Sequence, residues 1–148
     1  MSDDNVVLEQ YKMYVEMADR VSARRVATNK FYISLLAALL AFVTFVLSKQ
    51  ICYGYETAVL VSFSILGLVL NFVWLINIQS YRQLNSGKFR VIHEMEEKLA
   101  FPCYKKEWQI LGEGKDSKQY RRLTRVERFV PYILSLPYLI LLVYSVFR

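Results

Sequence analysis

The chain has 148 residues, 55% of them hydrophobic, and a formal net charge of +6 at pH 7. Its single histidine, His93, has no second histidine or cysteine cluster beside it, which excludes a plausible zinc site and a catalytic triad. The two cysteines give no disulfide framework. We therefore expect no cofactor and no catalytic residues, and the protein is not expected to be an enzyme.

Residues 1–30 are predicted to form a cytoplasmic N-terminal helix. No Gly or Pro occurs from Ser2 to Gln50, so the simplest structure is one helix that continues from solvent into the membrane. Apolar residues repeat at spacings of four, three, four and three, which is typical of a seam between helices, and we expect this seam to join copies of the chain. The seam consists of Val7, Tyr11, Tyr14, Ala18 and Val21. The alternative is an amphipathic helix on the membrane surface, which the equal numbers of acidic and basic residues disfavour.

Three stretches of the chain carry no charge: 31–48, 57–81 and 129–147. At about 1.5 Å per helical residue they reach roughly 27, 37 and 28 Å, close to the ~30 Å of bilayer hydrocarbon. Backbone polar groups in lipid need partners within their own segment, so each stretch is predicted to be a helix. The expected fold is an all-α integral membrane protein, with a transmembrane hairpin at 31–81 and a third transmembrane helix at 129–148.

Small and polar residues inside the second span lie on one helical face, followed by two polar residues near its end. They are Ser64, Gly67 and Asn71, then Asn77 and Gln79. Polar groups in lipid are costly unless another helix or water satisfies them. One interpretation is packing between helices. The other is that these residues line a water-filled path at the centre of a ring of subunits.

Lys and Arg are distributed unevenly among the connecting segments. Five precede residue 31, one lies in 49–56, twelve lie in 82–128 and one follows the third span. Because positive charge in short loops marks the cytoplasmic side, we expect the N-terminus inside and the C-terminus outside.

The segment 82–128 is predicted to be a cytoplasmic helical region. Arg82 to Leu99 has a helical apolar pattern that Pro102 ends, a short helix around Trp108 follows, and Thr124 to Glu127 fits a capping box before the third span. Together with residues 1–30 this region forms a small helical domain that self-association would complete.

Basic residues cluster at the mouth of the third span. They are Arg121, Arg122, Arg125 and Arg128. We expect them to contact lipid phosphates. Nucleic-acid binding is the competing interpretation, which the position next to the bilayer disfavours.

Specific residues resemble a known family. The string from Tyr11 to Arg20, then Ser22-Ala23-Arg24-Arg25, Ser80-Tyr81-Arg82-x-Leu84-Asn85-x-x-Lys88-Phe89, Glu107-Trp108 and Leu123-Thr124-x-x-Glu127, is similar to the RipA-type octameric membrane proteins of bacteria. The resemblance runs from about Glu9 to Pro131 and implies a homo-oligomeric ring of eight copies in the bacterial inner membrane. A looser resemblance links the chain to small two-span membrane effectors of antiviral defence, although the third span departs from that pattern.

Two functions are compatible with these features. In the first, the ring encloses a pore, gated by the cytoplasmic domain, that depolarises the membrane in antiviral defence. In the second, a non-conducting scaffold recruits a soluble cytoplasmic partner through Tyr104, Trp108 and the Lys105-Lys106 pair.

Overall fold

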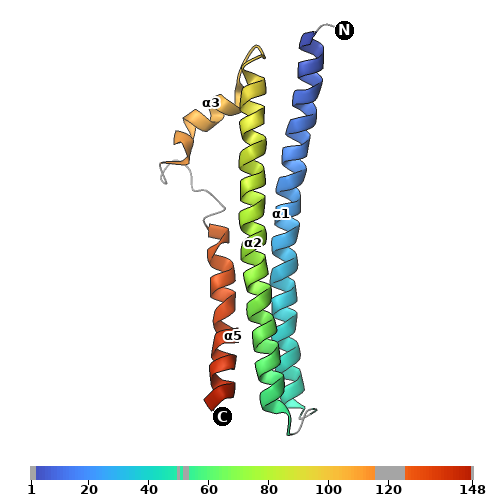
Figure 1. Cartoon of the computed structure of the whole chain (residues 1–148), viewed down its shortest axis with the longest axis vertical. Helices are drawn as coiled ribbons and strands as arrows, with labels where there is room; N and C mark the ends of the chain where they lie inside the picture. The colour runs from blue at the N-terminus through green and yellow to red at the C-terminus, as the bar shows by residue number, and fades with distance from the viewer. Residues whose placement is uncertain (1–2, 50, 52–53, 116–125, 148) are drawn as a thin grey trace. The chain divides into compact units, whose positions relative to one another are not determined.

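The computed structural model describes residues 3–49, 51, 54–115 and 126–147. Within these ranges the regular structure is entirely helical (Figure 1). The elements are α1 (Asp3–Ser48), α2 (Glu56–Glu96), α3 (Cys103–Ile110), the 3₁₀ turn η1 (Gly112–Gly114) and α5 (Phe129–Phe147). The predicted all-α fold with three long apolar helices is confirmed.

Two of the helices are much longer than a single membrane span. α1 has 46 residues without a break, as the absence of Gly and Pro predicts. α2 has 41 residues and continues from the second span through Arg82, where the sequence suggested a separate helix. It ends at Glu96 rather than Leu99, because the N–H groups of Lys98 and Leu99 turn back to the carbonyls of Met95 and Glu96 in tighter, 3₁₀-like bonds.

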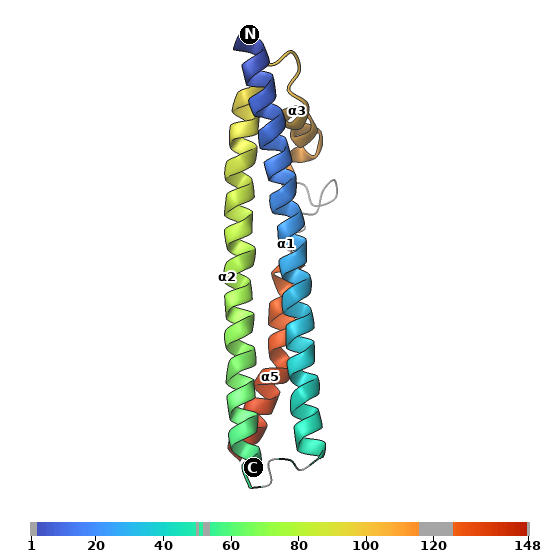
Figure 2. The ribbon, with the colours of Figure 1, turned by 90° about the vertical axis from the view of Figure 1, so that its right-hand side faces the viewer.

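The chain divides into two compact units, each built from separate parts of the sequence. The head unit comprises Met1–Val26 and Gln79–Val126, and the membrane unit comprises Ala27–Ile78 and Glu127–Arg148. In the head unit the first part of α1 lies beside the last part of α2, with α3 next to them (Figure 2).

The core of the membrane unit joins α1, α2 and α5. The buried side chains of the cluster where these helices meet are those of Leu36, Trp74, Ile78 and Tyr138. The Tyr32 ring stacks on Trp74 with centroids 5.7 Å apart, and the indole N–H of Trp74 donates to Asn29 Oδ1 at 2.9 Å. α5 is tied to α1 by the Tyr138 hydroxyl, which donates to the carbonyl of Leu36 at 2.6 Å.

Most of the apolar surface of these helices faces outward. α1, α2 and α5 are long and apolar enough to cross a membrane, yet only 17%, 28% and 17% of their most apolar windows are buried within the chain. Exposed side chains include Phe42, Phe72 and Ile140. A single copy therefore leaves large apolar faces that only lipid or other copies can cover.

Candidate functional site

One buried carboxylate joins three helices of the head unit. Glu96 is the last residue of α2 and is 1% exposed. Its Oε1 accepts hydrogen bonds from the Tyr11 hydroxyl of α1 at 3.1 Å and from the backbone N–H of Tyr104 in α3 at 2.7 Å. Its Oε2 accepts from the backbone N–H of Lys105 at 2.9 Å.

The local sequence explains why α3 needs this carboxylate. The first N–H groups of a helix have no partner within the helix, and Pro102 at the N-cap makes no side-chain hydrogen bond to them. Glu96 supplies the missing acceptor from the preceding helix, and its negative charge lies at the positive end of the α3 dipole. The three hydrogen bonds compensate for the loss of water around the buried charge.

The pKa values of three nearby groups are shifted. The pKa of Tyr11 lies above its ordinary value, mainly because burial disfavours the phenolate, and also because the phenol donates to the negatively charged Glu96. Tyr11 therefore remains a hydrogen-bond donor at neutral pH. On the surface, Lys105 Nζ lies 2.8 Å from Glu97 Oε1, which lowers the pKa of Glu97 and raises that of Lys105.

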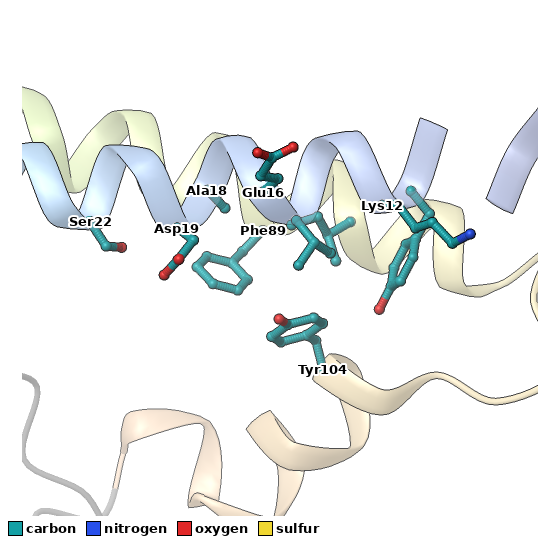
Figure 3. A pocket seen from close by; sticks show the side chains of 10 residues that line it. Lys12, Glu16, Ala18, Asp19, Ser22, Phe89 and Tyr104 are labelled. Atoms are coloured by element: carbon teal, nitrogen blue, oxygen red, sulfur yellow. The ribbon is translucent and has the colours of Figure 1, made fainter. Parts of the chain in front are cut away.

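A groove of about 700 Å³ lies between α1 and α3 in the head unit (Figure 3). Its floor contains Phe89 and Ile92 of α2, and Tyr104 projects from α3 into it. The Phe89 and Tyr104 rings meet edge to face with centroids 5.7 Å apart. α1 contributes apolar Val15 and Ala18, and charged residues along the rim: Lys12, Glu16 and Asp19. The sequence did not predict this groove.

The predicted oligomer seam is covered within one chain. Ala18 and Val21 are buried, and Val7, Tyr11 and Tyr14 are half-buried. The Lys88 ammonium of α2 lies 5.2 Å from the centre of the Tyr14 ring. The seam is thus a contact inside the head unit, and a role between copies stays a prediction.

The polar face of the second span points into the membrane unit. Ser64 and Asn71 are 1% and 3% exposed. Asn71 Nδ2 donates to the carbonyl of Gly67 at 2.9 Å, while Asn71 Oδ1 and Ser64 Oγ are buried without a partner among the described residues. A Cβ on Gly67 would lie 2.1 Å from the Tyr138 ring. This burial favours the packing interpretation for these three residues.

The two other polar residues of this stretch lie differently. Asn77 is half-buried and its Nδ2 donates to the Tyr32 hydroxyl at 3.0 Å and to the carbonyl of Val73 at 3.2 Å. Gln79 is exposed.

Most of the predicted basic cluster lies outside the described residues. This applies to Arg121, Arg122 and Arg125, and to Thr124 of the predicted capping box. Arg128 is described and exposed, immediately before α5. Within the described ranges, no three His, Cys, Asp or Glu residues are grouped so that they could hold a metal ion.

Comparison with known proteins supplies one match. The sequence model of the Octameric membrane protein family (8xMP) matches residues 8–147, nearly the whole chain. No curated protein and no solved structure matches the chain.

Proposed function

The chain belongs to the octameric membrane protein family, and on this premise we propose that eight copies form a non-conducting ring in the membrane that displays its head units to a soluble partner. The observation that carries the proposal is the burial of Ser64 and Asn71 inside a single chain. Two of the residues predicted to line a water-filled path are thus buried against other helices of the same chain, which supports a role in packing.

The symmetry of the ring follows from insertion into one membrane. Copies that insert with the same topology can be related only by rotation about the membrane normal, because a two-fold axis in the membrane plane would invert half of them. An octamer of this kind is cyclic and encloses an axis.

The size and lining of the central opening support the scaffold. Eight helices spaced about 10 Å apart lie on a circle of roughly 13 Å radius, which leaves an opening of roughly 8 Å radius, too wide for side chains to close. The exposed surfaces of the described spans are predominantly apolar, as Phe42, Phe72 and Ile140 illustrate. An opening lined this way holds lipid rather than a continuous column of water.

The partner would dock on the outer face of α3. Tyr104 faces the groove and Lys105 pairs with Glu97, so this proposal moves the contact from these two residues to their exposed neighbours. Phe101 and Ile110 are 62% and 69% exposed, with exposed Lys106 one helical turn before Ile110. Apolar side chains beside a positive charge fit a partner with an apolar patch bordered by carboxylates. The proposal assigns the chain no catalytic activity.

The second candidate is a pore whose opening depolarises the membrane in antiviral defence. The enclosed axis of a cyclic octamer supports it, and exposed Gln79 is the polar residue most suited to the mouth of such a path. Both candidates place the protein in the bacterial inner membrane with the head unit on the cytoplasmic side. In both, Arg128 would contact lipid phosphates at the cytoplasmic surface of the bilayer.

Dye release from liposomes tests the two candidates against each other. The purified octamer, and an Asn71→Asp variant whose octameric state has been verified, are reconstituted with a self-quenched dye and examined in parallel by single-channel recording. The scaffold proposal expects neither protein to release dye or conduct. Dye release or ion current from the wild type would overturn it in favour of the pore.

A further inference from the structure

We propose that neighbouring copies meet through their head units, where an exposed apolar ridge on α1 of one copy fills the groove between α1 and α3 of the next. The ridge consists of Val6, Met13 and Met17, which are 39%, 52% and 40% exposed. The inference rests on the cyclic ring of the proposed function and says where its copies touch.

The ridge and the groove lie on opposite sides of the same helix. At 100° per residue, the mean direction of the ridge residues is roughly 170° from that of the α1 residues lining the groove. Each head unit therefore carries an exposed apolar ridge and, on the other side of α1, a recess lined partly by apolar side chains. A cyclic ring needs this arrangement, because its interface joins two different surfaces of adjacent copies.

The heights of the two surfaces also agree. Rotation about the membrane normal places any residue at the same height in every copy. Met13 and Met17 lie on the same turns of α1 as the groove residues, which run from Tyr11 to Ser22. Met13 and Met17 of one copy can thus enter the groove of its neighbour without a shift along the membrane normal, while Val6 lies beyond the end of the groove.

The chemistry of the two surfaces is complementary. Flexible methionine side chains adapt to irregular apolar recesses and make favourable sulfur–aromatic contacts, and the groove presents Phe89 and Tyr104. Asp19 on the groove rim and Arg24 on the ridge side of α1 are both exposed, and the described residues show no partner for either. In the proposed interface, Asp19 of one copy and Arg24 of the next lie at the same edge, so that opposite charges meet there.

Disulfide cross-linking in the full-length protein tests this arrangement. In a Cys52→Ser/Cys103→Ser background, Met17→Cys places a thiol on the ridge and Asp19→Cys places one on the groove rim. The two positions point to opposite sides of α1, so the double variant cannot close a disulfide within one chain. On mild oxidation of the detergent-purified octamer, the double variant is expected to give a ladder extending to eight chains. Each single variant is expected to stay monomeric on a denaturing gel.

Other outcomes overturn the inference in distinguishable ways. Dimers from a single variant would indicate that like surfaces meet. An intact octamer without cross-links in the double variant would place the interface elsewhere, leaving the ring of the proposed function standing. A supporting measurement is gel filtration, in which Met17→Asp should yield smaller species while Ile110→Asp, on the exposed face of α3, should remain octameric. If Met17→Asp remained octameric, the ridge would not be the contact.

Discussion

The head unit and the membrane unit both bury polar side chains, and the charged carboxylate of Glu96 in the first is satisfied more fully than two neutral groups in the second. In the head unit, the Glu96 carboxylate accepts three hydrogen bonds from two other helices. In the membrane unit, the amide oxygen of Asn71 and the hydroxyl of Ser64 have no partner among the described residues.

The difference follows from the solvent that each unit would otherwise face. A carboxylate that leaves water loses strong hydration and must replace it fully. An amide that leaves lipid has no hydration to lose, so a partly satisfied polar group is tolerated in a membrane core. We therefore expect polar contacts to dominate the stability of the head unit, and close packing to dominate that of the membrane unit.

The largest expected effect is that of Glu96→Ala on the head unit. The substitution removes the acceptor for two backbone N–H groups of α3 and for the Tyr11 hydroxyl, and we expect a loss of about 3–5 kcal/mol in the free energy of unfolding. Hydrogen exchange should show α3 losing protection before the membrane unit does.

Glu97→Ala is the matched control for this variant, because it removes an exposed carboxylate whose ion pair, among the described residues, is with the Lys105 side chain. It should leave the exchange of α3 unchanged. Equal effects of the two substitutions would mean that the buried carboxylate has no special role.

Gly67→Ala should have the next largest effect, on the membrane unit. The added methyl group would lie 2.1 Å from Tyr138, whose ring is held by its hydrogen bond to Leu36, so α5 must shift. We expect a destabilisation of about 2–3 kcal/mol, measured by thermal unfolding in detergent.

Gly87→Ala is the control, because a Cβ there meets nothing within 4 Å. In a helix this change should stabilise by about 0.5–1 kcal/mol. If both glycine variants gained stability, close packing against Tyr138 would not hold the membrane unit together.

The smallest expected effect is that of Tyr11→Phe, about 1–2 kcal/mol at neutral pH through loss of one hydrogen bond to a carboxylate. The pH dependence of this loss in stability tests whether the pKa of Tyr11 is raised. The pKa of Tyr11 is raised in the folded protein, so this contribution is fully present below the unfolded pKa of about 10 and is lost as the pH rises above it.

The stability difference between wild type and Tyr11→Phe should therefore narrow in thermal unfolding curves recorded above pH 10. A difference that stays constant with pH would mean that the Tyr11 pKa is not raised.

Much of the fold could be predicted from local patterns. The charge-free runs predicted the three apolar helices, and the absence of Gly and Pro predicted the unbroken α1. The continuity of α2 was missed because the charge-free run ends at Tyr81, and the change from apolar to charged residues at Arg82 resembles the end of one helix and the start of another.

The candidate site was harder to predict, for physical reasons. Glu96 lies among Glu94 and Glu97 in a charged stretch, and nothing local distinguishes the carboxylate that becomes buried. Its partner Tyr11 is 85 residues away, and the groove exists only once α1, α2 and α3 are together. One signal was available in the sequence. A glutamate lies shortly before Pro102, and Pro102 stands at the N-terminus of a helix that it cannot cap with its own side chain.

The separation of Tyr11 from Glu96 also has a consequence for biogenesis. Ribosomes add about 5–20 residues per second, so roughly 4–17 s pass between synthesis of the two residues, and both helices of the transmembrane hairpin are synthesised in that interval. The nascent N-terminal segment must wait with Tyr11, Ala18 and Val21 uncovered until the chain returns from the lipid phase. A ribosome that stalls before Glu96 would therefore release a product unable to complete its head unit.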